Sequence, residues 1–118
     1  MATETNLDPF RLGEDWTITI DCQDSAGDPL DLTGGDLKFR LSDFDQTTLY
    51  LDLSKAEGVS IAAPATGRAV VLITADMQAG LKAQTFRYDT EAVLGDGTPS
   101  DQAFGTLPAD DSLFSSLP

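Results

Sequence analysis

Carboxylates are the most abundant groups in this chain that could do chemistry, since twenty of its 118 residues are Asp or Glu. Paired carboxylates act as general acid and base in glycosidases, and clustered carboxylates bind hard cations such as calcium. The densest groups are DSAGD at residues 24–28 and DFD at residues 43–45. Neither has the D-x-[DN]-x-[DN]-G order, closed by a Glu, that an EF-hand loop needs.

We interpret these acids as solvated turn residues, because nearly all of them fall in expected turns or at outward strand positions. Such positions give an acid none of the burial on which general acid–base catalysis relies. We therefore predict no metal and no cofactor. Weak calcium binding at residues 24–28 or 43–45, and a small enzyme with a carboxylate pair, stay open as alternatives.

Nucleophilic chemistry is restricted because the chain has no histidine and a single cysteine, Cys22. Without His it cannot form a Ser-His-Asp or Cys-His site from its own residues, and one thiol makes neither an internal disulfide nor a zinc site. Cys22 ends a row of inward apolar positions, which indicates a small buried hydrophobic residue. The glycines at 34–35 and 95–97 indicate turns rather than phosphate loops, because no Lys-Ser/Thr pair and no helix follows them. We predict no catalytic residue and no enzyme activity.

The charge balance limits the partners. Seven Lys and Arg against twenty Asp and Glu give a net charge of −13 and a pI near 4.1. Nucleic acid and anionic membranes both need a positive protein surface, so neither is expected to bind. No stretch approaches the roughly twenty apolar residues that cross a bilayer. With 41% apolar residues, the chain is expected to be a folded, soluble protein made in the cytoplasm.

The elements that must position any site are short strands, because apolar and polar side chains alternate with a period of two in several segments. The segments with strand character are residues 16–22, 36–42, 48–53, 58–61, 68–73, 85–94 and 102–107. A short return segment is expected at Leu30 and Leu32, and one or two helical turns at residues 74–80. About seven strands with frequent turn signals predict an all-β fold, an immunoglobulin-like or jelly-roll antiparallel β-sandwich with one short helix.

The predicted sandwich, residues 14–107, leaves an extended N-terminal arm at residues 1–13 and a C-terminal tail at residues 108–118. Both segments carry apolar side chains but are too short to form a core of their own. Burial against a neighbouring chain explains them, and folding back over the sandwich's own edges is the alternative. The candidate interface residues are Phe10, Leu12, Phe114 and Leu117.

Two aromatic residues are considered for ligand stacking. Trp16 begins the inward row of the first strand, so we expect it in the core. Tyr50 points away from Leu49 and Leu51 in the expected strand, which makes it the better candidate for a binding aromatic, although a cross-strand surface contact is the more ordinary role of such a residue. A carbohydrate-binding module is the alternative function that such a residue would serve.

The order of the motifs resembles the small β-sandwich modules of tailed bacteriophages, including the N-terminal domain of baseplate upper proteins and short tail or fibre-attachment proteins. The first part of the resemblance is GEDWTITI at 13–20, DSAGDPLDLTG at 24–34 and LKFRL at 37–41. The later part is GRAVVLIT at 67–74, FRYD at 86–89, DG at 96–97 and GTL at 105–107.

The resemblance implies a non-enzymatic virion structural protein, synthesised in the bacterial host cytoplasm, that acts as an adaptor in the tail, baseplate or fibre-attachment region. The partners it implies are other virion proteins and further copies of the chain in a symmetric homo-oligomer. A capsid decoration or head-to-tail connector protein is the alternative within the same class.

Overall fold

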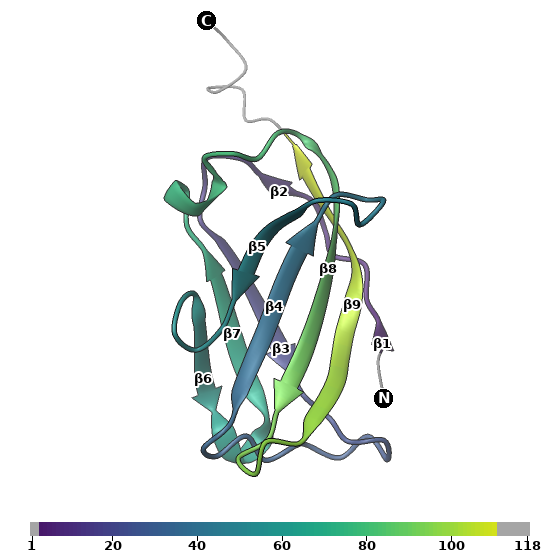
Figure 1. Cartoon of the computed structure of the whole chain (residues 1–118), viewed down its shortest axis with the longest axis vertical. Helices are drawn as coiled ribbons and strands as arrows, with labels where there is room; N and C mark the ends of the chain where they lie inside the picture. Colours follow the sequence, from purple (N-terminus) through teal and green to yellow (C-terminus); the bar gives the residue numbers. More distant parts are fainter. Residues whose placement is uncertain (1–2, 111–118) are drawn as a thin grey trace, which may run out of the picture.

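The computed structural model describes residues 3–110, which form two β-sheets packed face to face (Figure 1). The larger sheet has the order β1-β9-β8-β4-β5, with β2 also paired to β9, and the smaller sheet has the order β3-β7-β6. The strands are β1 (Thr3–Glu4), β2 (Phe10–Arg11), β3 (Trp16–Asp21), β4 (Asp36–Ser42), β5 (Leu49–Leu53), β6 (Val59–Ala63), β7 (Arg68–Ile73), β8 (Gln84–Val93) and β9 (Pro99–Asp110). The predicted all-β sandwich is confirmed.

The strand order is that of an immunoglobulin-type sandwich. In that fold one sheet contains strands A, B, E and D, and the other contains G, F and C, with C′ added in the variable type. Here β3, β7 and β6 take the places of B, E and D, while β9, β8, β4 and β5 take those of G, F, C and C′. Within residues 3–110 no strand fills the place of A beside β3, because the N-terminal segment pairs with β9 in the other sheet.

The hydrophobic core lies between the two sheets and follows the predicted alternation. The inward residues of β3 are buried while the outward ones are exposed, and β4 behaves in the same way. Phe39 in β4 and Phe86 in β8 are fully buried. Burying one large apolar side chain contributes about 1.5–3 kcal/mol, so these strands hold the sheets together.

The N-terminal segment is extended, and it lies against its own sandwich. Thr3 and Glu4 pair in parallel with Ala103 and Phe104, and β2 pairs in parallel with the end of β9. Because β1 and β2 add to the larger sheet, the strands of the described residues outnumber the seven or so that were predicted.

The last strand is longer than predicted. A short strand at 102–107 followed by a tail was expected, but β9 continues to Asp110, and Ala109 is buried. The ladder continues because β8 begins at Gln84, which faces Ala109. Pro108 lies within this strand, which therefore extends to Asp110, three residues past the predicted boundary at Leu107.

Helical structure is limited to two short 3-10 turns within the described residues. In place of the helix expected at 74–80 there is one such turn, η2 (Asp76–Gln78). Within it, the Met77 N–H donates a hydrogen bond back to the Thr74 carbonyl at 3.1 Å. The other is η1 (Pro64–Thr66), which ends at Gly67 with a φ of +75°. Leu30 and Leu32 are buried but form no strand. Among residues 3–110 no helix is long and apolar enough to span a membrane.

Candidate functional site

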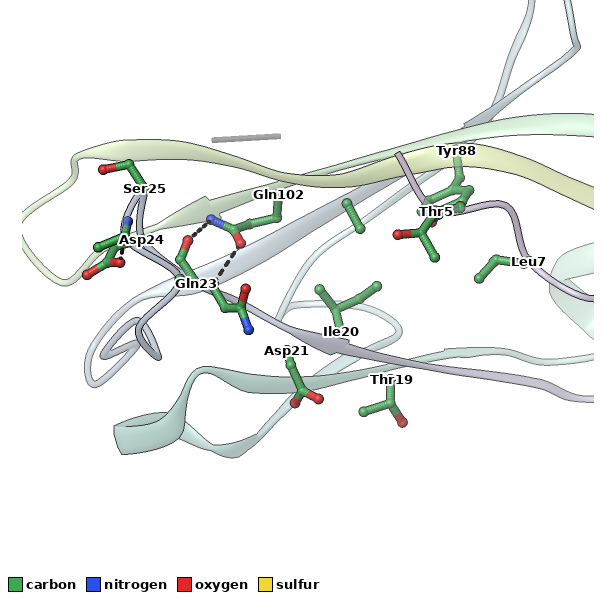
Figure 2. Close-up of a pocket in the computed structure, with 13 residues that line it drawn as sticks. Thr5, Leu7, Thr19, Ile20, Asp21, Gln23, Asp24, Ser25, Tyr88 and Gln102 are labelled. Carbon is green, nitrogen blue, oxygen red and sulfur yellow. Dashed lines mark hydrogen bonds between the residues drawn. The ribbon is translucent and has the colours of Figure 1, made fainter. Parts of the chain in front are cut away.

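A cleft lies between the two sheets, beside β3 (Figure 2). Its volume is about 430 Å³. One wall comes from β3 and the loop after it, and the other comes from the N-terminal segment, β8 and β9. The lining residues on which the argument depends are Thr5, Leu7, Thr19, Ile20, Gln102 and Ala103.

The cleft exists because the N-terminal segment pairs with the larger sheet, so that no strand of residues 3–110 lies against the outer edge of β3. Thr5 donates its N–H to the Phe104 carbonyl at 2.7 Å, and Leu7 donates to Thr106 at 2.9 Å. Gly105 permits this approach, since a Cβ at that position would lie 2.3 Å from the Thr5 carbonyl oxygen. A side chain there would force the two segments apart.

Two buried polar side chains of the cleft, Gln102 and Tyr88, are held by hydrogen bonds within the chain. Gln102 is only 5% exposed, and its amide pairs twice with the backbone of Gln23. The Gln23 N–H donates to Oε1 at 2.9 Å, and Nε2 donates to the Gln23 carbonyl at 3.1 Å. The Tyr88 hydroxyl donates to the Thr5 carbonyl at 2.6 Å. Burial raises the pKa of Tyr88, although that hydrogen bond acts in the opposite direction.

The two carboxylates at the cleft are also engaged. Asp21 accepts from Arg68 Nε at 2.8 Å, and this hydrogen bond lowers the pKa of the Asp21 carboxyl below its usual value. Asp24 accepts from the backbone N–H groups of Ala26 at 2.9 Å and Asp28 at 3.0 Å, which closes the turn after β3. The lowered pKa of Asp21 is the opposite of the raised pKa that a general acid requires.

The turn acids elsewhere behave as predicted. Hydrogen bonds from Thr33, Thr47 and Thr98 lower the pKa values of Asp31, Asp43 and Asp96. The Asp43 Oδ1 accepts from Thr47 N–H at 2.7 Å, which shapes the β4–β5 turn. Residues 3–110 contain no group of three or more side chains placed to hold a metal ion.

Trp16 and Cys22 are core residues, as the alternation predicted. Trp16 is 1% exposed, and its indole N–H donates to the Arg11 carbonyl at 2.8 Å. Cys22 is fully buried, and this burial raises the pKa of its thiol to about 11. Since a reactive thiol needs a low pKa and access to solvent, Cys22 is not placed to act as a nucleophile.

The predicted interface residues divide between the core and the undescribed tail. Phe10 is partly buried and stacks on Trp16 with ring centroids 5.4 Å apart, while Leu12 is 8% exposed. Both pack on this chain's own core, because the parallel pairing of β2 brings them there, as in the alternative that the arm folds back over the sandwich. An interface with another chain through these residues stays a prediction. Phe114 and Leu117 lie outside the described residues.

Tyr50 does not point into solvent as the strand pattern indicated. A β-bulge pairs Leu41 with Leu51 and Ser42 with Leu49, so Tyr50 has no partner of its own. Its ring meets the buried Phe86 ring edge-on at 5.5 Å, and Leu49 is the exposed neighbour. Tyr50 is thus part of the packing rather than a ligand platform.

Two features that define the cleft were not predicted from the sequence: an edge of β3 with which no strand of residues 3–110 pairs, and the two hydrogen bonds between the Gln102 amide and the Gln23 backbone. Alternation gave no signal for Gln102, because it lies five residues before Leu107 and a period of two places the two side chains on opposite faces. A register shift in the β8–β9 ladder brings both to the buried side. No protein-family model and no curated protein matches the sequence.

The high pKa of Cys22 gives a pH-dependent prediction. We expect a disulfide reagent at pH 8 to modify the native thiol about a hundredfold more slowly than the unfolded one, because the pKa rises from 9.0 to about 11. Thiolate formation favours the unfolded chain, so this contribution to stability is present below pH 9.0 and is lost as the pH rises through about 11. Reaction rates with and without urea measure the difference, and equal rates would contradict the burial of Cys22.

Proposed function

We propose that this chain is a non-enzymatic structural protein of a bacteriophage virion, an adaptor in the tail, baseplate or fibre-attachment region. The observation that supports a docking role is the cleft beside β3. Its buried side chains Gln102 and Tyr88 are hydrogen-bonded within the chain, and no strand of residues 3–110 pairs with the edge of β3 that lies along it. Such a cleft offers a surface on which an extended segment of another chain can pack.

The virion part of the proposal is supported by the sequence resemblance. The segments that carry the resemblance all lie in one sandwich: residues 24–34 lie between β3 and β4, residues 67–74 include β7, and residues 105–107 lie in β9. The proposed partners are other virion proteins and further copies of the chain, and the proposed place of synthesis is the cytoplasm of a bacterial host. A net charge of −13 would keep an unassembled pool soluble and away from DNA.

Immunogold electron microscopy tests this proposal. An antibody against the chain is applied to purified particles of the phage that encodes it, and we expect gold at the tail tip or along the tail. Label on the head would overturn the tail adaptor and favour the capsid alternative.

Two controls make a blank result meaningful. Disrupted particles expose epitopes that assembly covers, and particles lacking the gene product show the background. If intact and disrupted particles both stay unlabelled, the chain is not a virion component and the proposal fails.

A further inference from the structure

The larger sheet has an outer face that points away from the smaller sheet. Along β4 and β8 buried side chains alternate with more exposed ones, and the buried ones pack in the core. The others lie on the outer face, where β9, β8, β4 and β5 run side by side (Figure 1). In the rows from Lys38 to Ser42, the charged side chains of these four strands are the cations Lys38, Arg40 and Arg87 and the acids Asp52, Asp89, Glu91 and Asp101. We call these seven side chains the charged face.

The charged face is nearly neutral, whereas the chain as a whole is strongly acidic. Its three cations and four acids give it a charge of −1, so the other four cations and sixteen acids of the chain give −12. Two copies that each carry −13 repel one another, and this repulsion is smallest where the surfaces that meet are close to neutral. The charged face is therefore a place where a second acidic copy can approach.

Most charges of this face are not paired within residues 3–110. Arg40 is the one cation of the face in an ion pair there, with its Nε 3.4 Å from Asp52 Oδ1. Lys38 lies beside Glu91 in the β4–β8 ladder without forming an ion pair, and Glu91 lies beside another acid, Asp101, in the β8–β9 ladder. Like charges in directly opposite positions are destabilising. A cation brought from outside would relieve this repulsion.

Exposed apolar side chains lie next to the charged face. Phe44 and Leu49 are 51% and 55% exposed, and they are two of the three large apolar residues that are exposed within residues 3–110. Leu49 pairs with Ser42 at the end of β4, and Phe44 lies in the turn that follows, with its ring centroid 4.8 Å from the Arg87 guanidinium. Exposed apolar side chains beside a mixed charged surface are typical of a protein–protein interface.

We propose that a second copy of the chain packs on the charged face, related by a two-fold axis that runs parallel to the strands between β4 and β8. This axis sets β4 of each copy over β8 of the other and keeps the rows in the same order. Lys38 then faces Glu91 of the second copy, and Arg40 faces Asp89 of the second copy. A two-fold axis makes each of these contacts twice. The proposal goes beyond the proposed function, because this face is distinct from the cleft and the virion assignment is not used.

The charge pattern selects this axis and this partner. An axis perpendicular to the strands would keep β4 over β4, so that Lys38 and Arg40 of one copy would meet the same cations of the other. Like charges that meet in an interface oppose association. With the parallel axis, the cations of β4 and the acids of β8 are complementary to the same face of another copy, so a single kind of chain supplies both surfaces.

Light scattering after size-exclusion chromatography tests the association of the full chain. The measurement is made at physiological salt, where the Debye length is about 8 Å and charges far from the interface are screened. We expect the mass to rise with concentration from the 12.5 kDa of one chain toward twice that value.

Two charge-reversal variants test the contacts. Lys38→Glu with Arg40→Glu makes β4 negative, and Asp89→Lys with Glu91→Lys makes β8 positive. In a homodimer each variant meets its own like charge, so we expect association at least tenfold weaker than in the parent. These side chains lie outside the core, so both variants should keep the circular dichroism spectrum of the parent.

Mixing the two variants separates contacts between chains from contacts within one chain. The negative β4 of the first variant meets the positive β8 of the second, and the remaining β4 and β8 keep their original charges. We expect a one-to-one heterodimer in native mass spectrometry, although each variant alone stays monomeric. The substitutions shift the charge of −13 by four in either direction, to −17 or −9, so overall charge does not attract the two chains.

The matched control is Arg68→Glu with Lys82→Glu, which makes the same change in charge at exposed positions outside the charged face and should dimerise like the parent. A parent that is monomeric at every concentration, a β4 variant that dimerises as strongly as the parent, or a mixture without heterodimer would each overturn the proposal. Gold on the tail with a monomeric parent leaves the proposed function intact. Dimers without gold on particles overturn only that function.

Discussion

We expect Trp16→Ala to lower the free energy of unfolding by about 3–5 kcal/mol. Trp16 is 1% exposed, it stacks on Phe10, and it binds the Arg11 carbonyl through its indole N–H. The substitution therefore removes core packing and the contact that fixes β2 at the same time. Since a domain of this size is stable by about 5–15 kcal/mol, the loss is a large part of the total.

Urea unfolding followed by far-ultraviolet circular dichroism measures this loss, because the variant has no tryptophan left for fluorescence. Trp16→Phe is the matched control. It keeps an aromatic ring against Phe10 and loses the bond to Arg11, so a smaller loss of about 1–2 kcal/mol is expected. A loss below about 1 kcal/mol for Trp16→Ala would contradict the position of Trp16 in the core.

Gly105→Ala is expected to displace the N-terminal segment from β9 and to cost about 2–4 kcal/mol. The new Cβ would lie 2.3 Å from the Thr5 carbonyl oxygen, and φ at this position is +155°. Displacement breaks the bonds from Thr5 N–H to Phe104 and from the Tyr88 hydroxyl to Thr5. The displaced N-terminal segment would then no longer form its wall of the cleft.

Gly97→Ala separates this steric effect from backbone strain. Gly97 has a φ of +91° and no atom within 4 Å of an added Cβ, so strain alone should cost about 1–2 kcal/mol. Thermal unfolding gives the stabilities, and hydrogen exchange at Thr5 and Leu7 reports the docking of the segment. Similar losses for both variants, with Thr5 still protected, would show that Gly105 does not hold the segment in place.

Strand faces were predictable because they depend on local alternation. The inward positions of β3, from Trp16 to Ile20, and those of β4 were read from the order of apolar and polar residues alone. Turn acids were predictable for a similar reason, since Asp24 and Asp43 bond to backbone groups only two to five residues away. The burial of Cys22 also followed from its position in the alternating row.

Tyr50 and Pro108 were mispredicted because pairing with distant residues overrides the local pattern. A bulge opposite Leu41 and Ser42 turns Tyr50 toward Phe86, and no feature of residues 48–53 marks that extra residue. Pro108 looked like the end of a strand, but Thr85 in β8 still pairs with it. The predicted tail therefore began too early.

By itself, the sequence determined a strongly acidic all-β sandwich, its buried faces, its turn chemistry and the lack of histidine. Only the tertiary structure decided that the N-terminal segment pairs with β9, that Phe10 and Leu12 pack on the core, and that β3 has one edge without a strand partner among residues 3–110. The alternation of apolar and polar residues in a strand indicates which side chains face inward. This alternation does not indicate which strand pairs with it, because the neighbouring strand is formed by residues far away in the chain and is selected by the packing of both sheets together.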